Sequence, residues 1–102
     1  MAQGSLIRGA QVSLQRHGFL GVSVFAAAGM NVEELARATP WLSALRYKQL
    51  RYSTVGALRL ARFALIPTQE WPHYDIELPD LTAATLVRLI RCFGPPFTNP
   101  AS

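Results

Sequence analysis

Cysteine, histidine and lysine are almost absent from this sequence. It contains one cysteine, Cys92, one lysine, and two histidines, His17 and His73. A single cysteine excludes an internal disulfide and the cysteine-rich patterns that hold structural zinc. We therefore expect no metal and no cofactor, and the cytoplasm as the compartment. Cys92 has no evident activating partner in the sequence, so we expect it to pack at a helix end.

Long hydrophobic runs and dense charge are also missing. No apolar run approaches the ~20 residues that span a bilayer, so no membrane partner is expected. The chain has 102 residues, of which 50% are hydrophobic and 16% charged. This length suits one domain, but its apolar content exceeds what a small monomer easily buries. We therefore expect a homo-oligomer or a protein partner, with residues 41–45 as a candidate contact.

Local patterns predict a single α+β domain over residues 1–102, with about four strands in a mixed or antiparallel sheet and about three helices packed on it. Strand patterns fall at residues 20–26, 47–52, 63–67 and 73–78. The last two should pair antiparallel across a five-residue loop. Residues 1–18 are expected to form an irregular arm or a further strand, and residues 94–102 an extended tail from which Phe97 docks on the body.

Three segments carry helix signals. Residues 30–38 offer Asn31 as an N-cap and Glu34 for a capping box. Residues 53–62 begin with Ser53 or Thr54 as a cap, and residues 80–94 begin with Asp80. The last helix has the clearest apolar stripe and ends at a glycine followed by two prolines.

The stretch "HYDIELPD" places His73, Asp75 and Glu77 at alternate positions of the strand. Alternate residues share one face, so the row, with His17 from elsewhere, is a weak candidate for acid–base or metal chemistry. Three side chains that project in parallel from one strand do not converge on an ion. The favoured interpretation is a solvated face opposite an inward face of Tyr74, Ile76 and Leu78.

Positive charge is concentrated in the segment "RYKQLRYSTVGALRLAR". It contains no acidic residue, and tyrosines alternate with its cations: Arg46, Tyr47, Lys48, Arg51, Tyr52, Arg59 and Arg62. Cations that neutralise phosphates beside rings that stack on bases are typical of an RNA-binding surface. An ordinary solvated face and a protein interface are the alternatives.

The net charge of +4 and the pI near 10.0 favour association with polyanions. Our leading hypothesis is a small bacterial protein that acts through this basic surface on RNA or the ribosome, as a toxin-like or regulatory module. The alternative is a non-catalytic interaction subunit, such as an antitoxin, immunity or assembly protein. A small nuclease is the third hypothesis. The sequence does not decide whether the protein is an enzyme.

Overall fold

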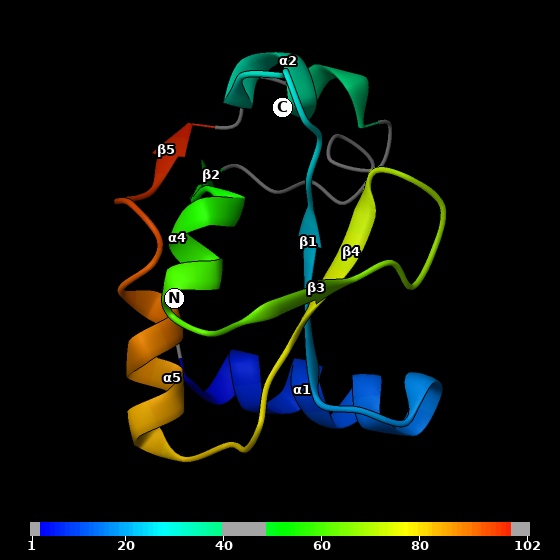
Figure 1. Ribbon diagram of the computed structural model, residues 1–102, viewed down its shortest axis with the longest axis vertical. Coiled ribbons are helices and arrows are strands. Elements are labelled where there is room, and N and C mark those ends of the chain that lie inside the picture. Colours follow the sequence, from blue (N-terminus) through cyan, green and yellow to red (C-terminus); the bar gives the residue numbers. More distant parts are fainter. Residues whose placement is uncertain (1–2, 40–48, 99–102) are drawn as a thin grey trace.

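The computed structural model describes residues 3–39 and 49–98. The candidate contact at residues 41–45 lies outside these ranges. Within them the chain forms the expected α+β fold, with helices arranged around a small antiparallel sheet (Figure 1). No helix in the described ranges is both long and apolar enough to cross a membrane.

The main sheet has three strands in the order β1–β4–β3: β1 (Gly21–Phe25), β4 (His73–Glu77) and β3 (Ala64–Ile66). The antiparallel pairing of β3 with β4 confirms the predicted hairpin. β1 pairs antiparallel with the other side of β4, with Ser23 opposite Asp75. The strand that carries the histidine–carboxylate row is therefore the central one.

A second, two-stranded sheet joins β2 (Gln49–Leu50) to β5 (Phe97–Thr98). Phe97 docks as expected, because its ring meets the edge of the Tyr52 ring with the centroids 5.8 Å apart. The backbone N–H of Gly94 also donates to the carbonyl of Tyr52 at 2.9 Å. The segment after the last helix is therefore fixed against β2 and the residues that follow it.

The prediction of an irregular arm or strand at the N-terminus is wrong, because the segment forms α1 (Gln3–His17). Leu6, Ala10 and Ser13 are buried at helical spacing. Two of these three are small and one is polar, so the buried face gives a weak hydrophobic signal. Val12 and Leu14, on either side of Ser13, give the alternation of apolar and polar residues that is typical of a strand, but both side chains are exposed.

The three predicted helices are present as α2 (Val32–Ala38), α4 (Val55–Leu60) and α5 (Ala83–Ile90). Asn31 and Glu34 form the expected capping box of α2, and Thr54 caps α4. The predicted cap of α5 is wrong. Thr82 occupies that position, and the Asp80 carboxylate instead accepts hydrogen bonds from Thr82 and Thr85.

The helices enclose the sheet from several sides. In Figure 1, α4 and α5 stand beside the sheet, α1 crosses one end of it and α2 lies at the other end. The core gathers Leu58 of α4, Ile76 of β4 and Leu89 of α5, together with Leu6, Ala10, Phe63, Leu78 and Leu86. The sheet and α5 therefore share one apolar centre, and α4 joins it through Leu58.

Candidate functional site

The histidine–carboxylate row of β4 is largely buried, so the expectation of a solvated face is wrong for two of its three members. His73 is 7% exposed and Asp75 is 2% exposed, whereas Glu77 lies on the surface. The opposite face behaves as expected at Ile76 and Leu78, which are both buried.

Two hydroxyl groups from other parts of the chain donate hydrogen bonds to the buried carboxylate of Asp75 and offset the cost of burying it. Ser23, directly across the sheet on β1, donates to Asp75 Oδ1 at 3.3 Å. Thr68, in the loop between β3 and β4, donates to Asp75 Oδ2 at 2.5 Å. A buried carboxylate without such donors would cost several kcal/mol of stability, about the magnitude expected for an unpaired charge.

The same threonine links His73 to the carboxylate. Thr68 Oγ1 lies 3.2 Å from His73 Nδ1. A hydroxyl has a single proton, and Thr68 gives its own to Asp75, so Nδ1 of His73 must donate to the threonine oxygen. The His73 ring packs nearly perpendicular to the Phe25 ring, with the centroids 5.6 Å apart. The group formed by Ser23, Thr68, His73 and Asp75, which we call the polar clasp, ties the β3–β4 loop to the sheet.

The clasp has no metal-binding geometry. No three His, Cys, Asp or Glu side chains in the described part of the chain are grouped so that they could hold a metal ion. His17, the remaining candidate, lies exposed at the C-terminal end of α1, with its ring centroid 6.0 Å from that of Phe19. The arrangement is that of a hydrogen-bonded anchor.

Two members of the basic segment take part in internal contacts. Arg51 is half-buried and donates to the carbonyl of Gly94 at 3.3 Å. Tyr52 packs against Phe97 while part of its ring remains exposed. Arg46, Tyr47 and Lys48 lie outside the described residues.

Arg59 and Arg62 are both exposed near the C-terminal end of α4. Arg59 follows Ala57 by two residues, which is about 200° around a helix, so the two lie on opposite sides of α4. Arg62 follows the helix in the left-handed conformation, with a φ of 67°. Glycine is usual at that position after a helix, so the arginine there carries some backbone strain.

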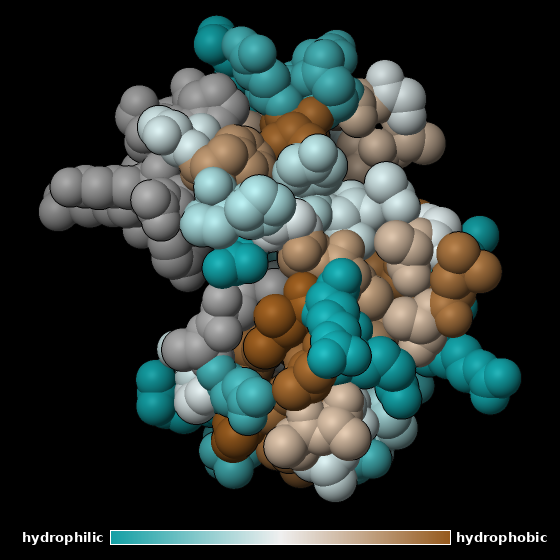
Figure 2. Space-filling view, turned by 90° about the vertical axis from the view of Figure 1, so that its left-hand side faces the viewer, coloured by the Kyte–Doolittle hydropathy of each residue, from teal (hydrophilic) through white to brown (hydrophobic). Residues whose placement is uncertain are grey.

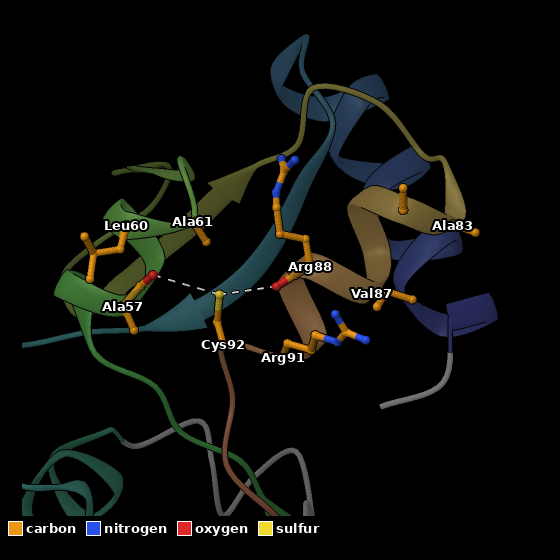
Figure 3. Close-up of a pocket in the computed structure, with 9 residues that line it drawn as sticks. Ala57, Leu60, Ala61, Ala83, Val87, Arg88, Arg91 and Cys92 are labelled. Carbon is orange, nitrogen blue, oxygen red and sulfur yellow. Dashed lines mark hydrogen bonds between the residues drawn. The ribbon is translucent and has the colours of Figure 1, made fainter.

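The structure brings α4 beside α5 and leaves an open groove of about 910 Å³ between them (Figure 3). Most of its lining is apolar, and many of the side chains are small. The residues are Ala57, Leu60 and Ala61 from α4, and Ala83, Ala84, Val87, Arg88, Arg91 and Cys92 from α5 and its end. We call this feature the α4–α5 groove.

Cys92 lies between the two helices, at the middle of the groove in Figure 3. Its thiol donates to the carbonyl of Arg88 at 3.4 Å and lies 4.0 Å from that of Ala57. Burial raises the pKa of the Cys92 thiol above its ordinary value, and the positive charge of Arg88 opposes this only in part. The thiol therefore acts as a neutral link between the helices.

Two arginines stand at the α5 side of the groove. The Arg88 guanidinium lies 4.8 Å from the centre of the Phe63 ring. Hydrogen bonds from Thr85 and Thr82 lower the pKa of Asp80 to about 2, and Arg88 adds a weaker electrostatic contribution. Arg91 is exposed. On this side of the molecule, apolar side chains lie directly beside strongly hydrophilic ones (Figure 2).

The chain matches no protein family model, no curated protein and no solved structure. The sequence patterns did not predict the α4–α5 groove. The signal was present, since Ala57, Leu60 and Ala61 share one helical face, as do Ala83, Ala84 and Val87. Two such faces become a groove only once the fold has placed the helices side by side.

Proposed function

We propose that this protein is a non-catalytic interaction subunit that binds a protein partner through the α4–α5 groove. The observation that carries the proposal is Leu60, which is 88% exposed at the edge of an apolar groove. A large aliphatic side chain exposed beside further apolar surface is typical of an interaction site.

The shape and charge of the groove suit this role. Alanines along both walls let a partner approach the helix backbones closely. Arg88 and Arg91 add a polar rim, and arginine is among the residues enriched at energetically important interface positions. An apolar centre with a charged edge is the usual anatomy of a protein interface. Antitoxin, immunity and assembly subunits are examples of this class, and the cytoplasm is the compartment that we propose.

The test is substitution of Leu60 by aspartate. We expect Leu60→Asp to abolish partner binding without lowering the free energy of unfolding, because the side chain is already in water. Co-purification and light scattering measure binding, and urea denaturation measures stability. Leu14→Asp, at another exposed leucine on α1, is the matched control and should bind normally. Loss of binding in both variants, or in neither, would contradict the proposal.

A second function, binding of RNA or the ribosome as a toxin-like or regulatory module, is favoured by the exposed arginines. Arg59, Arg62 and Arg91 are all exposed, and the one ion pair among the described residues joins Arg37 to Glu33 at 2.9 Å. Arginines without carboxylate partners remain available for phosphates.

This second function predicts that single-stranded RNA binds with an affinity that falls steeply as salt increases. Reversing Arg59 and Arg62 to glutamate should then remove binding, because both the charge and its sign change. Filter binding or fluorescence anisotropy at several salt concentrations measures this. Absence of binding at low salt would eliminate the function, and so would binding unchanged by the double reversal.

A further inference from the structure

We propose that the α4–α5 groove binds a second copy of this chain, which inserts its β3–β4 loop, residues 67–72, in a head-to-tail arrangement. This inference rests on the proposed function and names its partner. It predicts that the anchor residue of the loop is Trp71 and that Glu70 beside it pairs with the arginines of the groove.

The β3–β4 loop carries an exposed aromatic residue next to an exposed carboxylate. Trp71 is 55% exposed, and Glu70 is also on the surface. Tryptophan is the residue most enriched among those that dominate binding energy, and an exposed one next to a carboxylate suits an apolar groove with a cationic rim. Arg91, which is exposed, can also lie over the indole face, an arrangement that stabilises aromatic–cation pairs.

The polar clasp holds this loop in place before any partner arrives. Thr68 donates to Asp75 at the start of the loop. At its end the backbone N–H of His73 donates to the carbonyl of Glu70 at 3.0 Å, and that of Ala26 donates to the carbonyl of Pro72 at 2.9 Å. A loop fixed at both ends loses little conformational entropy on binding. The buried carboxylate of Asp75 thereby helps to hold the loop in the conformation that exposes Trp71.

Charge favours this pairing over a symmetric one. The loop carries Glu70 on the surface, whereas the groove carries Arg88 and Arg91. Two grooves facing each other across a two-fold axis would bring arginines together, and like charges in contact oppose association. A loop that carries a carboxylate removes this repulsion.

The two surfaces lie on opposite sides of the molecule. In Figure 1 the β3–β4 loop extends from the side of the sheet that is away from α4 and α5. The loop of one chain therefore cannot fill its own groove, and the contact must form between molecules. Because each chain would present one loop and one groove, association continues into an open chain or closes into a ring.

The test is the assembly state of the full chain, followed by sedimentation velocity over a wide range of concentration. We expect the wild-type protein to form species larger than a dimer. Trp71→Ala should weaken association by about thirtyfold, which is the effect of losing a dominant interface residue. Arg91→Glu should have a similar effect, whereas Arg59→Glu, on the other side of α4, is the matched control and should assemble normally.

Mixing the two defective variants gives the decisive measurement. The Trp71→Ala chain keeps an intact groove and the Arg91→Glu chain keeps an intact loop, so an equal mixture should form a dimer that grows no further. The double variant Glu70→Arg, Arg91→Glu should recover part of the assembly, because the charges are exchanged. Circular dichroism and thermal unfolding confirm that each variant is folded.

Three outcomes overturn the inference. They are a wild-type chain that stays monomeric at every concentration, assembly that survives both single variants, and a mixture that does not form dimers. If a different partner binds in a way that depends on Leu60 but not on Trp71, the groove is an interaction site with another occupant. If Leu60→Asp changes no binding of any kind, the proposed function fails as well.

Discussion

At the scale of single residues, Asp75 shows that the position of a strand in its sheet decides whether a polar side chain is exposed or buried. A strand of alternating polar and apolar residues has a solvent-exposed polar face only if no other part of the protein covers that face. Here β4 is the central strand, and hydroxyls of Ser23 and Thr68 reach the carboxylate from both sides. The carboxylate is therefore an internal acceptor that joins a strand and a loop.

Removing this acceptor should destabilise the fold. We expect Asp75→Ala to lower the free energy of unfolding by about 1–3 kcal/mol, because the hydroxyls of Ser23 and Thr68 lose their partner in a buried site. Glu77→Ala, two residues along the same face but exposed, should change it by less than about 0.5 kcal/mol. Urea denaturation of both variants measures the difference. Equal effects would mean that the row is solvated after all.

At the scale of elements, the contact between α1 and β1 depends on the absence of a side chain at Gly21. A Cβ atom there would lie 2.7 Å from Ser13 Oγ, 2.9 Å from the Phe19 ring and 3.0 Å from Asp75 Cβ. All three distances are shorter than van der Waals contact. A glycine in the first strand thus sets how closely the first helix and its following turn approach the sheet.

Two glycine substitutions should therefore have opposite effects. Gly21→Ala should destabilise the protein by about 1–3 kcal/mol through overpacking. Gly9→Ala, within α1 and with no atom within 4 Å of the added Cβ, should stabilise it by about 0.5–1 kcal/mol. Thermal unfolding of the two variants under one condition measures both. A stabilising Gly21→Ala would show that α1 does not pack on β1 at this distance.

Elements with local signals were predictable, and those that depend on distant partners were not. The β3–β4 hairpin and the capping box of Asn31 and Glu34 are encoded within a few residues. The N-terminal helix was missed because Ala10 and Ser13 supply much of its buried face. The burial of Asp75 was missed because one of its donors, Ser23, is 52 residues away. The groove required two helices whose contact no local pattern reveals.

At the scale of the whole molecule, the β3–β4 loop carries the carboxylate of Glu70, and the α4–α5 groove carries Arg88 and Arg91. If assembly joins Glu70 to Arg91, it should weaken as salt increases, because the Debye length falls from about 10 Å at 0.1 M to about 3 Å at 1 M salt. The apolar contact of Trp71 should leave a residual association at high salt. Sedimentation at both salt concentrations measures the change. Association that strengthens with salt would indicate a purely apolar contact.

The pairing of β1 with β4 also has a consequence for the way the chain is made. Ser23 and its partner Asp75 are separated by 52 residues, so synthesis at 5–20 residues per second delays the second strand by about 3–10 s. During that interval β1, with Val22, Val24 and Phe25, has no strand to pair with on either side. The main sheet thus closes late in translation, when most of the chain is already present, and a nascent chain that stalls before β4 exposes an apolar strand.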